Sequence, residues 1–121
     1  MQRSMMQVFI KNSDKAIPFY QNVFGVEAAI YGLHSDGTVI HAEFDIFGQA
    51  FAICETLENE TLTGNIMQFC LHFGEGKEEI VRGIIDKLSD GALSAQIIPV
   101  DFSPLLADIT DKFGMRWCIF I

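Results

Sequence analysis

The sequence predicts an α+β fold made of two copies of one β-α-β-β-β unit, joined as a mixed sheet with its helices on the outer face. Each half of the chain has one amphipathic helical pattern near its start and alternating strand patterns around it. Two dipeptides also recur in both halves: Met6-Gln7 matches Met67-Gln68, and Phe47-Gly48 matches Phe113-Gly114. The 121 residues have the length of a single domain, 1–121, with module one at about 5–55 and module two at about 65–121.

Module one begins with an apolar extended segment at 5–10, followed by a helix. Asn12-Ser13-Asp14 offers an N-cap, so this helix should begin near Ser13 or Asp14 and end at Gly25, which favours the left-handed conformation. Pro18 should remove one backbone hydrogen bond or delay the start of the helix to about residue 17.

Three strands should complete module one, at about 26–33, 38–47 and 49–55. The second has strict alternation, which places one set of side chains on the apolar face, Ile40, Ala42, Phe44 and Ile46. The opposite face then carries His41, Glu43 and Asp45.

A polar, acidic segment from Glu55 to Gly64 should link the modules as a solvated loop. Module two repeats the order of elements, with a strand at 65–74, a helix near 77–88 and strands at about 94–100, 105–110 and 115–121. The helix has one apolar stripe, made of Ile80, Val81, Ile84, Ile85 and Leu88. A single helix covers one face of its sheet, so the other face of each module needs a partner or a ligand, and two such faces form a trough.

Three strings resemble the vicinal oxygen chelate superfamily (glyoxalase I, bleomycin-resistance proteins and extradiol dioxygenases), and in particular its PhnB-like branch. They are Ala16-Ile17-Pro18-Phe19-Tyr20-Gln21-Asn22-Val23-Phe24-Gly25, Ile40-His41-Ala42-Glu43 and Thr110-Asp111-Lys112-Phe113-Gly114-Met115-Arg116-Trp117. The resemblance implies a cup-shaped glyoxalase-like fold, completed by a homodimer partner. Lys112, where the branch has proline, and the run 102–107 depart from the pattern, so the resemblance does not transfer a ligand.

Metal-dependent members of the superfamily place His or Glu ligands on the first and last strand of each module. The matching positions here lie near Met5 or Gln7, near Ala52, at Gln68 and at Cys118. Alanine has no donor atom, glutamine and thioether are poor ligands for such cations, and one thiol cannot hold a metal alone. We therefore expect no metal and no cofactor.

His41 and Glu43 form the sharpest candidate for catalysis, because alternation puts both on one strand face, where a carboxylate can orient an imidazole and raise its basicity. The alternative is that both line a polar trough or a dimer seam, bonded to neighbours such as Arg116. Cys118 is a candidate nucleophile beside Arg116, or a buried inert thiol. The predicted lining of the cup consists of Gln7, Phe9, Gln68, Cys70, His72, Arg116 and Cys118.

The composition excludes several classes of function. Eight basic residues against 16 acidic ones give a net charge of -8, which disfavours nucleic acid and anionic membranes. No apolar run approaches a membrane span and the N-terminus does not look secretory, so we expect a cytoplasmic protein. Three cysteines without Cys-x-x-Cys spacing indicate reduced, buried thiols.

Three functions fit the sequence. The first is a metal-free binder of a small apolar or aromatic molecule that works as a homodimer. The second is an enzyme of lyase, isomerase or dioxygenase type that uses His41 and Glu43. The third is a structural dimer whose cup is filled by its own side chains.

Overall fold

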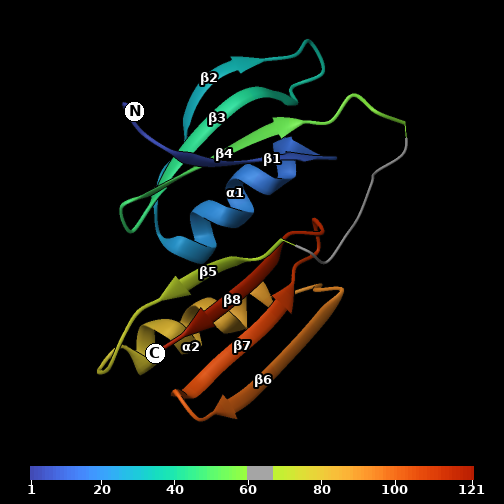
Figure 1. Ribbon diagram of the computed structural model, residues 1–121. Coiled ribbons are helices and arrows are strands. Elements are labelled where there is room, and N and C mark those ends of the chain that lie inside the picture. The colour runs from blue at the N-terminus through green and yellow to red at the C-terminus, as the bar shows by residue number, and fades with distance from the viewer. Residues whose placement is uncertain (60–66) are drawn as a thin grey trace. The chain divides into compact units, whose positions relative to one another are not determined.

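The computed structural model describes residues 1–59 and 67–121 and confirms the predicted α+β architecture. The chain forms two compact units, Met1–Thr61 and Leu62–Ile121. In its described residues each unit has one helix and one four-stranded mixed sheet, in the order β-α-β-β-β (Figure 1). The repetition that the sequence predicts is therefore a repetition of structure.

The first unit has one helix between its first two strands. Its elements are β1 (Met5–Ile10), α1 (Ser13–Phe24), β2 (Ala29–Leu33), β3 (Val39–Ile46) and β4 (Gln49–Glu55). The strand order is β1-β4-β3-β2, with β1 parallel to β4 and the other neighbours antiparallel. The helix therefore crosses from one edge of the sheet to the other.

The second unit repeats this topology. Its elements are β5 (Phe69–His72), α2 (Glu78–Leu88), β6 (Ser94–Val100), β7 (Ser103–Thr110) and β8 (Arg116–Phe120). The strand order is β5-β8-β7-β6, with β5 parallel to β8. The strand that the sequence predicts from residue 65 begins at Phe69, and positions 65 and 66 lie outside the described residues.

The repeated Phe-Gly dipeptide lies in equivalent turns of the two units. Phe47-Gly48 joins β3 to β4, and Phe113-Gly114 belongs to the turn that joins β7 to β8. Gly48 and Gly114 both have positive φ angles, 92° and 88°, which residues other than glycine rarely adopt. The repeated dipeptide therefore supplies a glycine where the backbone of each unit needs a positive φ angle.

The start of α1 is stabilised by a distant residue rather than by its own N-cap. Asn12 makes no capping bond through its side chain. Instead, the Glu55 carboxylate at the end of β4 accepts hydrogen bonds from the backbone N–H groups of Asn12 (3.1 Å) and Ser13 (2.8 Å). Glu55 is thus a helix cap, not the solvated loop residue that the sequence predicts. Pro18 lies inside the helix without delaying its start.

Each core lies between the helix and the sheet of its own unit. In the first unit the Tyr20 ring on α1 contacts Phe44 and Phe51, with ring centroids 6.4 Å and 5.6 Å away. In the second, the helix buries Val81, Ile84, Ile85 and Leu88. Two predicted core positions are wrong, because Ile40 and Ile80 are about half exposed. Val39 is buried instead of Ile40, where the β2–β3 register is irregular.

A buried carboxylate organises the turn before β8. Asp111 is fully buried and accepts hydrogen bonds from the backbone N–H groups of Phe113 (2.9 Å) and Met115 (3.0 Å). Its other oxygen accepts one from the indole N–H of Trp117 (2.8 Å), which is itself fully buried. The carboxylate thus accepts hydrogen bonds from three N–H groups in the turn and in β8.

We predict that Asp111→Asn destabilises the protein by about 2–3 kcal/mol, because the amide turns an N–H group towards one of these donors and removes the charge from the hydrogen bonds. Urea unfolding would measure the loss. The matched control is Asp86→Asn at an exposed position of α2, which should stay within about 0.5 kcal/mol of the native protein. Equal stability of the two variants would contradict the proposed role of Asp111.

Candidate functional site

One face of each sheet is left without a helix. In the first unit the register places one set of side chains on that face, Met5, Gln7, Phe9, His41, Glu43, Ala52 and Cys54. The alternate positions, such as Phe44 and Phe51, pack against α1. The candidate chemistry of the first unit therefore lies on its uncovered face, as the alternation of β3 predicts.

A chain of contacts crosses this face from Arg3 to Cys54. The Arg3 guanidinium donates two hydrogen bonds of 2.8 Å to the Glu43 carboxylate. Glu43 Oε1 lies 2.9 Å from His41 Nε2, and His41 Nδ1 lies 3.6 Å from the Cys54 sulfur. The predicted contact between His41 and Glu43 is present, and it is extended by a residue on either side.

The charges in this chain limit what each group can do. Hydrogen bonds from Arg3 and then from His41 lower the pKa of Glu43 to about 2, so its carboxylate is too weak a base to take a proton at neutral pH. Burial raises the pKa of the Cys54 thiol, which keeps the thiol protonated. Glu43 orients the ring of His41, whose other nitrogen faces the Cys54 thiol.

The site predicted from the sequence lacks Arg3 and Cys54. The position of Cys54 opposite His41 could have been predicted from the sequence. The β3–β4 hairpin pairs Ile46 with Gln49, and counting back along the same register sets Cys54 opposite His41. Arg3 gave no such signal, because it lies outside any strand and 40 residues from Glu43.

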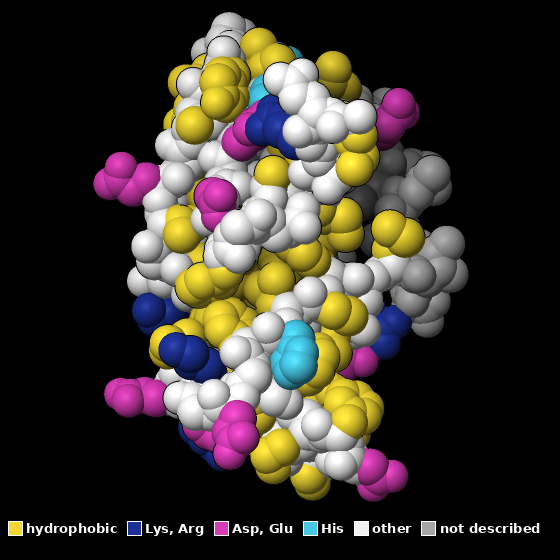
Figure 2. All heavy atoms as spheres, turned by 60° about the vertical axis from the view of Figure 1, so that its left-hand side comes forward, with side chains coloured by type: hydrophobic (Ala, Val, Ile, Leu, Met, Phe, Trp, Pro, Cys, Tyr) yellow, Lys and Arg dark blue, Asp and Glu magenta, His cyan; other side chains and the backbone are white. Residues whose placement is uncertain are grey.

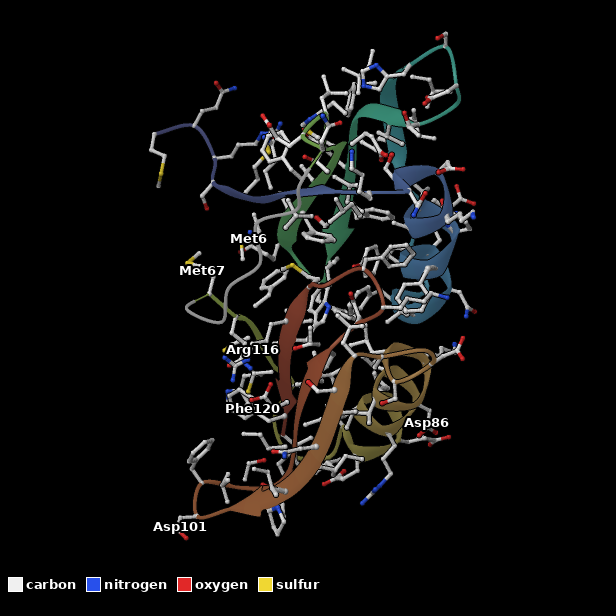
Figure 3. All side chains as sticks on the ribbon, turned by 90° about the vertical axis from the view of Figure 1, so that its right-hand side faces the viewer. Met6, Met67, Asp86, Asp101, Arg116 and Phe120 are labelled. Atoms are coloured by element: carbon white, nitrogen blue, oxygen red, sulfur yellow. The ribbon has the colours of Figure 1, made fainter. Side chains whose placement is uncertain are left out.

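The uncovered face of the second unit carries most of the predicted cup lining. The register sets Cys70 beside Cys118 and His72 beside Phe120, and Arg116 shares their face (Figure 3). Arg116 forms a 2.8 Å ion pair with Asp108 on β7. Gln68 donates to the same carboxylate at 3.0 Å. The predicted residues are thus joined through Asp108, which no sequence pattern singled out.

The two thiols of this face differ from the buried pair that the sequence predicts. Cys70 is exposed and Cys118 is half-buried, so the expectation of buried thiols holds only for Cys54. Burial, with a smaller contribution from Cys70, raises the pKa of Cys118 to about 11. The positive charge of Arg116 lowers the pKa of Cys118, but this effect is smaller than the effect of burial. Cys118 is therefore protonated at neutral pH and is a poor nucleophile.

A pocket of about 470 Å³ opens beside this face, lined by His72, Glu75, Glu78, Phe102, Pro104 and Ile121. The His72 ring stacks on Phe120, with centroids 4.5 Å apart and planes 5° from parallel. Phe102 meets Phe120 edge to face at 5.8 Å. Figure 2 shows a histidine next to hydrophobic side chains on one face of the molecule. The pocket therefore offers flat aromatic surfaces with carboxylates at its edge.

The residues at the expected ligand positions do not suit the divalent cation of the metal-dependent superfamily members that the sequence analysis considered. Gln7 stands beside Ala52, and Cys118 stands beside Cys70, near Gln68. Among residues 1–59 and 67–121, no three His, Cys, Asp or Glu side chains gather where they could hold a metal ion. The donor set needed for such a cation is therefore lacking in this part of the chain.

Solved structures with the same fold belong to several kinds of protein. The PhnB protein from Bacillus cereus superposes with a TM-score of 0.79 at 24% identity, over 98% of both chains. Protein PA1353 from Pseudomonas aeruginosa gives 0.80 at 15% identity, over 99% of this chain and 97% of the other. The fosfomycin resistance protein FosX from Listeria monocytogenes gives 0.70 at 16%, over 99% and 92%. Neither a protein-family model nor a curated protein matches the chain.

We predict that Arg3→Gln raises the pKa of Glu43 from about 2 towards the ordinary glutamate value, because its strongest hydrogen bonds are lost. A carbon-13 NMR titration of the side-chain carboxyl would measure this. Because the pKa of Glu43 is lowered in the folded state, the ionised carboxylate stabilises the fold fully at pH values above about 4.3, the ordinary pKa of glutamate. This stabilisation is lost as the pH falls towards 2. Arg3→Gln should therefore make the free energy of unfolding depend less on pH in the acid range. The control Arg82→Gln, on α2, should change neither the Glu43 titration nor the pH dependence of stability.

Proposed function

We propose that this chain, which has the glyoxalase-like fold of the vicinal oxygen chelate superfamily, is a member of that superfamily that binds a small apolar or aromatic molecule without a metal ion. We further propose that it works as a homodimer. The pocket beside β5 and β8 is the observation that carries the first proposal. Its volume lies in the range typical of small-molecule sites, and its aromatic rings suit a flat ligand.

The charges near the pocket favour a ligand without a net negative charge. Glu75 and Glu78 line the pocket, and the whole chain carries a net charge of -8. Arg116, a cation on the uncovered face at the other end of β8, is held by Asp108. An anionic ligand would thus meet acidic groups, whereas a neutral aromatic one can pack against Phe102 and the His72 ring. An open pocket also supports binding over a purely structural role.

The homodimer proposal rests on the edge strands. β2 and β6 each end a sheet and carry exposed apolar side chains, Ile30, Tyr31 and Leu33 on the first and Ile97 and Ile98 on the second. Such edges are open to pairing with another strand. A second copy of the chain would cover apolar surface that a monomer leaves in water.

A cytoplasmic location is supported by the free thiols. All three cysteines are free, and Cys70 is exposed, which suits a reducing compartment. Within the described residues no helix is both long and apolar enough to cross a membrane.

An enzyme that uses His41 is the second candidate, and the contact chain from Arg3 to Cys54 favours it. In that role Glu43 orients the imidazole, and His41 gives or takes a proton at its second nitrogen. The solved structures with this fold include a glyoxalase-related enzyme from Clostridium phytofermentans. Any turnover that survives His41→Gln unchanged would exclude this role.

We predict that the neutral fluorophore N-phenyl-1-naphthylamine binds saturably, at one molecule per chain. Phe102→Ala should weaken binding about two- to tenfold, because one aromatic contact is worth roughly 0.5–1.5 kcal/mol. Fluorescence titration measures the affinity, and sedimentation of the same complex should give the mass of two chains.

The matched control is Phe47→Ala, which removes a phenylalanine of similar exposure that is not part of the pocket lining. Its affinity should equal that of the native chain. Binding that never saturates, or that is insensitive to Phe102→Ala, would contradict the pocket. A single-chain mass would contradict the homodimer.

A further inference from the structure

The two thiols on the uncovered face of the second unit lie directly opposite each other. Cys70 on β5 and Cys118 on β8 are register partners on neighbouring parallel strands, so their side chains project from the same face. The Cys118 thiol interacts with the Cys70 thiol. Cys70 is exposed, so a small ion can reach the pair from solvent.

From this placement we propose that Cys70 and Cys118 form a two-coordinate site for a soft, thiol-seeking cation of the Cu(I) type. On binding, each thiol loses its proton to solvent and each sulfur forms one bond to the cation. The oxidation state of the metal does not change. The site lies within the second unit and does not depend on the ligand proposed for the pocket.

The spacing of the strands allows one cation to bridge the two sulfur atoms. Neighbouring strands lie about 4.7–4.9 Å apart. Two metal–sulfur bonds of about 2.3 Å placed end to end span nearly that distance. A disulfide also fits strands at this spacing, so the site exists only while both thiols are reduced, and both cysteines are free in the structure.

The donor set favours a soft cation over zinc or calcium. Zinc in structural sites takes four ligands, and the described part of the chain has no third His, Cys, Asp or Glu that completes a group with these thiols. Two sulfur donors suit Cu(I), which accepts linear coordination and prefers thiolates. The Asp108 carboxylate raises the pKa of Cys118 and the Arg116 guanidinium lowers it, so the two charges of this ion pair oppose each other at the site.

The test is a titration of the reduced full-length chain with Cu(I), without oxygen and in competition with the coloured chelator bicinchoninate. We expect one Cu(I) per chain. Cys70→Ser and Cys118→Ser should each weaken binding by at least about 100-fold, because even the loss of a residue that only supports a ligand costs 10- to 100-fold. Cys54→Ala removes the third thiol, which lies in the first unit, and should leave the affinity unchanged.

A native chain that does not compete for Cu(I) would overturn the proposal. So would a Cys70→Ser variant that still binds one ion tightly, or a loss of binding in Cys54→Ala. Cys70 is exposed, so its serine variant should fold even if the Cys118 variant does not. X-ray absorption at the copper edge provides a second measurement, which should find two sulfur neighbours; nitrogen or oxygen neighbours alone would also overturn the site.

Discussion

A single helix can cover only one face of a four-stranded sheet, and this constraint shapes the chemistry of both units. The apolar positions of β3, β4, β7 and β8 that face the helix are filled by large side chains such as Phe51 and Trp117. Alternation sends the intervening side chains to the other face. The candidate site residues His41 and Glu43 of the first unit, and Cys70, His72 and Cys118 of the second, lie on that face for this reason.

Both units neutralise a carboxylate on the uncovered face with an arginine. Glu43 on β3 is held by Arg3, and Asp108 on the equivalent strand β7 is held by Arg116. Isolated charges on a partly dry surface would be costly, so this pairing lets the faces keep polar groups while presenting little free charge. This pairing is also why we propose a neutral aromatic ligand for the second unit, and in the first unit Glu43 as the group that orients His41 rather than as a base.

The sequence predicted the features that depend on local periodicity. Alternation in β3 placed His41 and Glu43 correctly, and the helical stripe of α2 placed Val81 and Leu88. It could not predict contacts between distant segments. Glu55 caps α1 from 42 residues away, and Gln68 reaches Asp108 across 40. Predicting these contacts requires knowing which strands pair in parallel, and no local sequence pattern shows this. The contact between Cys54 and His41 is different, because the register of the β3–β4 hairpin could have predicted it.

Mapping of the bound ligand is the most direct test of the claim that the uncovered face of the second unit is the working surface. Nitrogen-15 and aromatic carbon-13 NMR spectra would be recorded during titration with N-phenyl-1-naphthylamine. The largest shifts should occur at His72, Phe102 and Phe120, with little change at Ile84 and Trp117 on the helix-covered side. Shifts centred on Ile84 and Trp117, in the core between α2 and the sheet, would contradict the account.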